Sequence, residues 1–219
     1  MRGAVVNAPL EVLLRDTRIW RARGTGVAAP AAPDTLSTGW PKLDARLPGG
    51  GWPLGTLIEL LLPAAGIGEL RLLLPALRAL AAEPAADDGR RWLAWVAPPH
   101  TPYPPALAQN GLRPDRLLLV SAGLAQDRLW AAEQALRSGG CAAVLAWLDA
   151  VDDRWLRRLK LAAQASRTLA VLFRPPQCRA QASPAALRLA LEATPGGLDL
   201  AVLKSRGGAP ARVHDVLGA

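Results

Sequence analysis

Apolar residues recur along most of the chain in two alternating patterns, one helical and one extended. Between residues 66 and 82 leucine returns every three or four positions, which predicts a helix that Pro75 kinks. Further helices are predicted at 106–110, 125–138 and 152–165. Mainly apolar runs predict buried strands at 56–62, 92–97, 117–121, 143–147 and 169–173. This alternation is typical of an α/β fold with a mainly parallel sheet and helices on both faces.

The two ends of the chain follow other patterns. Residues 10–23 predict an amphipathic helix, and the stretch 24–34, rich in glycine, alanine and proline, predicts a linker. Two short extended runs, 187–192 and 198–204, are joined by a glycine-containing turn and predict an antiparallel hairpin. Candidate protein-interaction residues on the first helix are Leu10, Leu13, Leu14 and Trp20. Whether this helix docks on a neighbour or on its own core is left open.

These patterns predict three parts. Residues 1–35 form an amino-terminal amphipathic helix with a flexible linker, 36–174 the α/β core, and 175–219 a loop, hairpin and tail. The length of 219 residues is enough for one sizeable core. No apolar run is long enough to span a membrane, so we expect a cytoplasmic protein without membrane contact.

Composition adds two constraints. The formal charge of +8 favours an acidic partner, either nucleic acid or an acidic protein surface, although a composition rich in arginine, alanine and proline also gives such a charge without any binding role. Cys141 and Cys178 lie far apart and lack metal-ligand spacing, so we expect neither a metal site nor a disulfide.

A glycine-rich stretch after the first predicted strand lacks the chemistry of a phosphate-binding loop. Such a loop needs a lysine to neutralise the phosphates and a hydroxyl to bind magnesium. Here Gly66 and Gly68 are followed by Glu69 and Leu70. A carboxylate repels a triphosphate and leucine cannot ligate a metal. We therefore expect no cofactor and no ATP hydrolysis, and whether any nucleotide is retained is left open.

The chain resembles the RecA recombinase family from about Leu36 to Phe173 and, more weakly, to Pro210. The resemblance rests on Ser37–Gly39, Gly50–Gly55, Gly111–Leu118 and Glu133–Gly139, and it implies a RecA-like core. At the position matching the family's catalytic glutamate stands Pro99, and at the position matching its magnesium-binding aspartate stands Trp147. Together with Glu69, these residues imply a RecA-like pseudo-ATPase rather than an enzyme.

Within this group the chain is similar to the ImuA family, on the runs 48–53, 66–75, 97–100, 130–136 and 173–176. This resemblance implies a non-catalytic accessory of SOS-induced, error-prone translesion DNA synthesis. Its expected partners are a polymerase-like translesion protein of the ImuB type and an error-prone replicative-type polymerase, with the recombinase and a second copy as further candidates. Direct DNA contact is left open.

Two other functions remain as alternatives. One is a SulA-like cell-division inhibitor that binds the tubulin-like division protein. The other is a basic DNA-binding module, in which the helix at 152–165 grips phosphates with its cations and stacks Trp155 on a base. The candidate DNA-binding residues are Arg154, Arg157, Arg158 and Lys160. The same cations also suit an ordinary solvated helix face.

Overall fold

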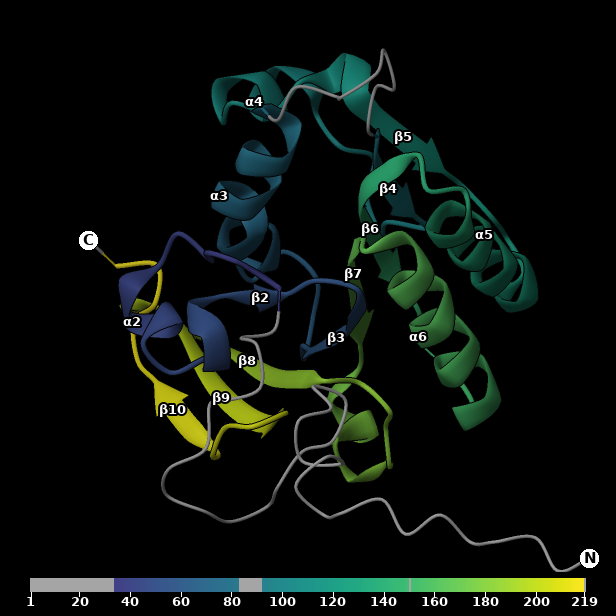
Figure 1. Cartoon of the computed structure of the whole chain (residues 1–219). Helices are drawn as coiled ribbons and strands as arrows, with labels where there is room; N and C mark the ends of the chain where they lie inside the picture. Colours follow the sequence, from purple (N-terminus) through teal and green to yellow (C-terminus); the bar gives the residue numbers. More distant parts are fainter. Residues whose placement is uncertain (1–33, 83–91, 150, 219) are drawn as a thin grey trace, which may run out of the picture. The chain divides into compact units, whose positions relative to one another are not determined.

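The computed structural model of the chain describes residues 34–82, 92–149 and 151–218 (Figure 1). The predicted amino-terminal helix, with Leu10, Leu13, Leu14 and Trp20, lies outside these residues. The strands are β1 (Thr35–Leu36), β2 (Trp52–Pro53), β3 (Thr56–Leu61), β4 (Trp92–Val96), β5 (Leu117–Val120), β6 (Cys141–Trp147), β7 (Leu169–Arg174), β8 (Leu187–Thr194), β9 (Gly197–Ser205) and β10 (Ala211–Val213). The helices are α2 (Pro41–Asp44), α3 (Glu69–Ala82), α4 (Pro104–Gln109), α5 (Ala125–Arg137) and α6 (Asp153–Ser166), with 3-10 turns η1 (Pro48–Gly50), η2 (Pro114–Arg116) and η3 (Pro176–Ala180).

Eight of the described strands form one sheet in the order β10-β9-β8-β3-β7-β6-β4-β5. Pairing is parallel from β8 to β5 and antiparallel between β8, β9 and β10. A two-residue turn joins β8 to β9, and so short a connection permits only antiparallel pairing. Strands β1 and β2 make a separate antiparallel pair.

The predicted fold class, a RecA-like and mainly parallel α/β core with a hairpin added to it, is therefore corrected to a mixed sheet with helices. Antiparallel pairing is part of the main sheet, because β8 is hydrogen-bonded to β3 on one side and to β9 on the other. The RecA-like assignment rested on short local motifs along the chain, and such motifs do not specify the strand order of a whole sheet.

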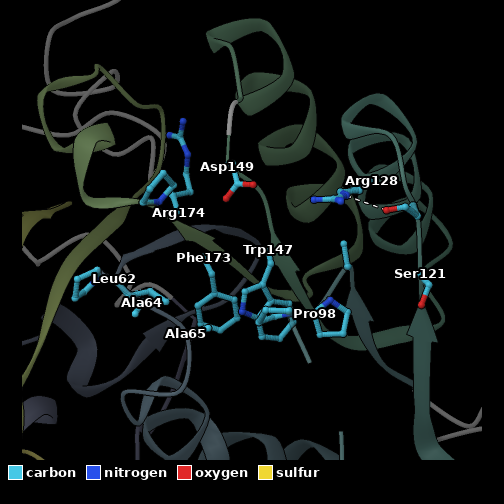
Figure 2. A pocket seen from close by; sticks show the side chains of 15 residues that line it. Leu62, Ala64, Ala65, Pro98, Ser121, Arg128, Trp147, Asp149, Phe173 and Arg174 are labelled. Carbon is cyan, nitrogen blue, oxygen red and sulfur yellow. Dashed lines mark hydrogen bonds between the residues drawn. The ribbon is translucent and has the colours of Figure 1, made fainter. Parts of the chain in front are cut away.

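The parallel part of the sheet brings five strand ends together. The carboxyl ends of β3, β4, β5, β6 and β7 lie at the same end of the sheet, and the loops that follow these strands surround a hollow (Figure 2). Ligands of α/β proteins commonly bind outside the carboxyl ends of the strands. This end of the sheet is therefore the first place to look for a functional site.

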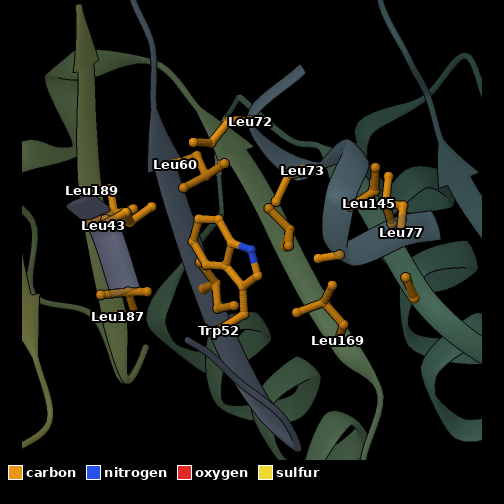
Figure 3. Close-up of a cluster of buried hydrophobic side chains, with 14 of the residues drawn as sticks. Leu43, Trp52, Leu60, Leu72, Leu73, Leu77, Leu145, Leu169, Leu187 and Leu189 are labelled. Carbon is orange, nitrogen blue, oxygen red and sulfur yellow. The ribbon is translucent and has the colours of Figure 1, made fainter. Parts of the chain in front are cut away.

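Two apolar clusters hold the helices to the sheet. Helices α2 and α3 pack on one face, where the Trp52 indole is fully buried among leucines of α3, β3 and β8 (Figure 3). Helices α5 and α6 pack on the other face, through Leu136, Leu156 and Leu159. Within the described residues, no helix combines the length and apolar character needed to cross a bilayer.

The predicted kink residue, Pro75, lies inside α3 and is closely covered. A Cβ at Gly39, whose φ is +80°, would stand 2.3 Å from the Pro75 Cβ, so only glycine permits this approach. The neighbouring Trp40 Nε1 donates a hydrogen bond to the Leu72 carbonyl at 2.9 Å. The segment before α2 is thereby fixed to the first half of α3.

A carboxylate ties β9 to the segment after β10. Asp199 accepts hydrogen bonds from the Asp215 N–H at 2.9 Å and lies 2.6 Å from His214 Nδ1. The hydrogen bond from Asp215 and, after it, the contact with His214 lower the pKa of Asp199. A depressed carboxyl pKa stabilises the fold above the ordinary aspartate value, and this contribution is lost as pH falls through the folded-state pKa.

We therefore expect acid to weaken the wild-type fold more than that of the variant Asp199→Asn. Asparagine keeps an acceptor for the Asp215 N–H but does not titrate. Urea unfolding from pH 6 down to pH 2 measures the difference in unfolding free energy between the two proteins. This difference should shrink below about pH 4, the ordinary range of an aspartate; a difference independent of pH would show that Asp199 contributes no charge-dependent stability.

Candidate functional site

The hollow at the carboxyl end of the sheet has a volume of about 450 Å³, within the usual range of ligand pockets. Its walls come from the loops after β3, β4 and β5 and from the ends of β6 and β7. Arg128 is held to the loop after β5, because its guanidinium donates to the carbonyls of Ala122 at 2.9 Å and Gly123 at 3.2 Å. Asp149 is exposed on the opposite wall (Figure 2).

Aromatic rings fill the base of this hollow. The Trp147 indole stacks on Phe173 with a centroid distance of 4.4 Å (Figure 2). Its ring centroid lies 6.0 Å from that of Trp95. The Trp147 Nε1 is buried and has no hydrogen-bond partner among the described residues. The side chain thus fills space at the end of β6 and offers no oxygen to a metal.

The other predicted nucleotide-site positions lie around the loop between β3 and α3. Gly66 and Gly68 have φ values of +86° and +111°, and Glu69 is the first residue of α3. Its carboxylate, only 3% exposed, accepts the Gly66 N–H at 2.8 and 3.1 Å through its two oxygens. The carboxylate therefore occupies a backbone donor of the glycine loop. Leu70 packs against the core, and Pro99 is exposed at the rim of the hollow.

A buried ion cluster lies beside the hollow and was not predicted. Glu59, fully buried in β3, accepts from Arg174 at 3.1 Å, from Arg188 at 2.7 Å and from the Ser183 hydroxyl at 2.8 Å. The Arg188 guanidinium also donates to the backbone carbonyls of Cys178 at 2.7 Å and Gln181 at 3.0 Å, and Arg174 donates to the side-chain Oε1 of Gln181 at 3.1 Å. A charged residue in the middle of the apolar run 56–62 was the sequence signal for this cluster.

The cluster holds more positive than negative charge, with two guanidiniums for one carboxylate. Its neighbour Lys204 donates to the Ser183 carbonyl at 2.7 Å. Burial and the nearby cations Arg188 and Lys160 lower the pKa of Lys204. Three cations therefore lie near the single buried carboxylate of Glu59, and loss of this carboxylate would leave the buried guanidiniums without a counter-charge.

The predicted DNA-binding cations do not form one free patch on α6. Arg157 is ion-paired with Asp153, and Arg158 binds the buried Glu133 of α5, with 3.2 Å between Nε and Oε1. Arg158 also lies 4.0 Å from the Trp155 ring centroid. Lys160 is half-buried, and Arg154 is exposed. Direct DNA binding by these residues stays a prediction, and two of the four cations already serve the fold.

Exposed apolar side chains gather in one part of the chain. Among the described residues, the large hydrophobic side chains that are exposed all lie between positions 92 and 161. Most of them belong to β4, β5 and the segments that follow these strands. They are Trp92, Tyr103, Leu118, Leu119 and Leu124, which we call the β4–β5 edge surface. Trp130 on α5 and Leu161 on α6 complete the set.

Metal chemistry finds no support in the part of the chain that the structure describes. No group of three or more histidine, cysteine, aspartate or glutamate side chains is arranged there to hold an ion. Cys141 and Cys178 are both buried, on β6 and in η3. His100 is exposed in the segment after β4.

Comparison with known proteins gives a consistent result for the centre of the chain. The family model described as "Cell division inhibitor SulA" matches residues 64–170. Curated proteins of that name are similar: the one from Edwardsiella piscicida is 33% identical over 106 residues, 48% of this chain and 60% of that protein. The one from Photorhabdus laumondii is 32% identical over 118 residues, 54% of this chain and 63% of that protein. The chain thus spans about three fifths of these relatives' length.

A solved structure bears the same name. SulA from Pseudomonas aeruginosa is 30% identical in sequence, with 54% of this chain and 97% of that chain covered and a TM-score of 0.44.

These findings overturn the resemblance to the ImuA family. The predicted role in translesion synthesis is wrong, and so are the predicted partners: the polymerase-like protein, the error-prone polymerase and, with them, the recombinase and the second copy. The runs on which the ImuA resemblance rested, such as 66–75 and 130–136, lie largely inside the segment that the SulA model matches. Residues 64–170 are therefore similar to the SulA family of cell division inhibitors, and the comparisons point to SulA rather than ImuA.

Proposed function

We propose that this chain is a non-enzymatic inhibitor of cell division that acts in the cytoplasm by binding the tubulin-like division protein. One observation carries the proposal. The segment similar to the SulA family, 64–170, also contains every exposed large hydrophobic side chain of the described residues. Exposed aromatic and other large apolar side chains are candidates for protein-binding contacts. The DNA-damage (SOS) setting expected from the sequence is compatible with this role.

The β4–β5 edge surface is the binding surface in this proposal. Tyr103 and Leu124 are the most exposed of its members, at 69% and 70%, although both are large apolar side chains. Aromatic side chains dominate the energetics of many interfaces, because they bury a large area at a small entropic cost. Tyr103 is therefore the expected centre of the contact.

The inhibitor works without nucleotide in this proposal. Glu69 already occupies the Gly66 N–H in the glycine loop, and Trp147 fills the end of β6. Binding alone then accounts for the effect on division, and no chemical step is required of the chain.

Overproduction of the protein in its host is expected to give long, undivided cells. Tyr103→Ala should weaken inhibition, with at least a 10-fold higher protein level needed for the same cell length, because it truncates the proposed centre of the contact. Leu161→Ala is the matched control, since Leu161 is 65% exposed but lies on α6, outside the β4–β5 edge surface. Microscopy of cell length against protein level, measured by immunoblot, provides the readout.

Cells that divide normally at high levels of folded wild-type protein would refute the inhibitor role. Equal losses from Tyr103→Ala and Leu161→Ala would leave the inhibitor role intact. They would show that the binding surface is not confined to the β4–β5 edge surface and includes α6.

A further inference from the structure

Within the residues that the structure describes, strand β5 is an unprotected edge of the main sheet. It pairs with β4 on one side, and its residues Leu117–Val120 include no charge and no proline. Leu118 and Leu119 are 42% and 40% exposed, although strand residues of this kind are usually covered. Proteins normally protect such edges with charges, proline, bulges or a covering element, because unpaired backbone groups recruit other strands.

The direction of the unpaired backbone groups follows from the pairing with β4. The Val120 carbonyl accepts the Ala97 N–H at 2.8 Å, so the backbone polar groups of Val120 point toward β4. These groups alternate in direction from one residue to the next along a strand. The N–H and C=O of Leu119 and the C=O of Leu117 therefore point away from the sheet, whereas the Leu117 N–H donates to the Pro114 carbonyl at the end of η2.

The opposite edge of the same sheet is protected. Strand β10 has three residues, carries the exposed Arg212 at its centre and follows Pro210. These are common devices against strand pairing. The protected edge lies outside the segment similar to the SulA family, and the unprotected edge lies inside it. The unprotected edge therefore belongs to the part of the chain to which the proposed function is attached.

Charged side chains flank β5. Arg116 precedes the strand, and its buried Nε has no hydrogen-bond partner among the described residues. After the strand, the Arg128 guanidinium is bound to the loop carbonyls of Ala122 and Gly123, with Asp127 next to it in the first turn of α5. Arg116 has no ion pair within the described part of the chain, so an added segment is favoured when an acidic residue lies at the end beside Arg116.

We propose that β5 binds an extended, mainly apolar segment of the division protein, which adds to the sheet as a further strand. The segment pairs with the outward N–H and C=O groups of Leu119 and the outward C=O of Leu117, and its apolar side chains cover Leu118 and Leu119. Main-chain hydrogen bonds supply affinity in this mode of recognition. The proposal rests on the proposed function, because it names the way in which that target is held.

The test distinguishes the contribution of the Leu119 backbone to binding from that of its side chain. Leu119→Pro removes the outward N–H, which β4 does not use, whereas Leu119→Ala keeps the N–H and shortens the side chain. Affinity for the purified division protein is measured by biolayer interferometry. Leu119→Pro is expected to weaken binding about 100-fold, and Leu119→Ala less than about 10-fold. Circular dichroism and the melting temperature check that both variants keep the fold.

Hydrogen exchange on the wild-type protein provides a second readout that needs no variant. The amide of Leu119 should exchange rapidly in the free protein and become protected when the division protein is added. Unchanged exchange in a saturated complex would overturn strand addition.

The remaining outcomes separate this proposal from the proposed function. A wild-type protein that does not bind the division protein at all refutes the proposed function itself. Equal losses from Leu119→Pro and Leu119→Ala, with wild-type binding intact, mean that the target contacts side chains only, and strand addition is wrong. Self-association that Leu119→Pro abolishes, with target binding retained, assigns the edge to a second copy and likewise overturns the proposal.

Discussion

Replacement of Glu59 by alanine is expected to lower the free energy of unfolding by about 3–5 kcal/mol, the range measured when one partner of a buried ion pair is removed. Glu59 is fully buried and is the counter-charge shared by Arg174 and Arg188, which are almost completely buried themselves. Without the carboxylate, two desolvated guanidiniums face each other with no anion between them. Urea unfolding followed by tryptophan fluorescence measures the loss.

Glu192→Ala is the control for this prediction. Glu192 is an exposed glutamate on β8, a strand that pairs with β3, and its removal should change the stability by no more than about 0.5 kcal/mol. A loss below about 1 kcal/mol for Glu59→Ala would mean that water or a rearranged side chain replaces the carboxylate, and that the cluster does not anchor the segment 178–181.

Trp147→Ala is expected to cost about 3 kcal/mol of stability, near the lower end for a buried aromatic side chain because the indole lines the hollow and is partly exposed. The substitution removes the ring that stacks on Phe173 and contacts Trp95, and it leaves a cavity at the base of the hollow. Trp147→Phe keeps a ring in this place and should cost about 1 kcal/mol.

Thermal unfolding of both Trp147 variants beside the wild type measures the two losses. If alanine is tolerated as well as phenylalanine, the indole does not stabilise the end of β6, and its position at the hollow needs a role in binding instead.

Much of the secondary structure could be predicted from the sequence, because apolar runs and helical spacing report burial directly. The strand expected at 92–97 is β4, and the helix expected at 152–165 is α6, whose N-cap Asp152 accepts the Trp155 N–H at 2.7 Å. The short strands β1, β2 and β10 were missed, because two or three residues carry no periodicity.

The family assignment failed for a different reason. Glycine turns, a following helix and an apolar strand recur in related and unrelated α/β proteins, because each meets a local backbone requirement. The residues that distinguish one function from another are spread over a surface. Leu118 and Leu119 read as buried strand residues in the sequence, and only the position of β5 at the edge of the sheet exposes them.

In the candidate site, too, the sequence showed individual residues but not the contacts that they make. A carboxylate at position 69 was visible in the sequence, but its contact with the Gly66 N–H depends on the geometry of the loop. The ion cluster at Glu59 had one sequence signal, a charge within an apolar strand, while its partners Arg174 and Arg188 lie more than a hundred residues away along the chain.

Light scattering of the purified division protein, assembling with GTP, tests the central claim most directly. The account predicts that the full-length chain suppresses assembly in proportion to its concentration, with or without added ATP, and that Tyr103→Ala suppresses it at least 10-fold less effectively. Assembly that proceeds unchanged in a several-fold molar excess of folded wild-type protein would contradict the assignment as a division inhibitor.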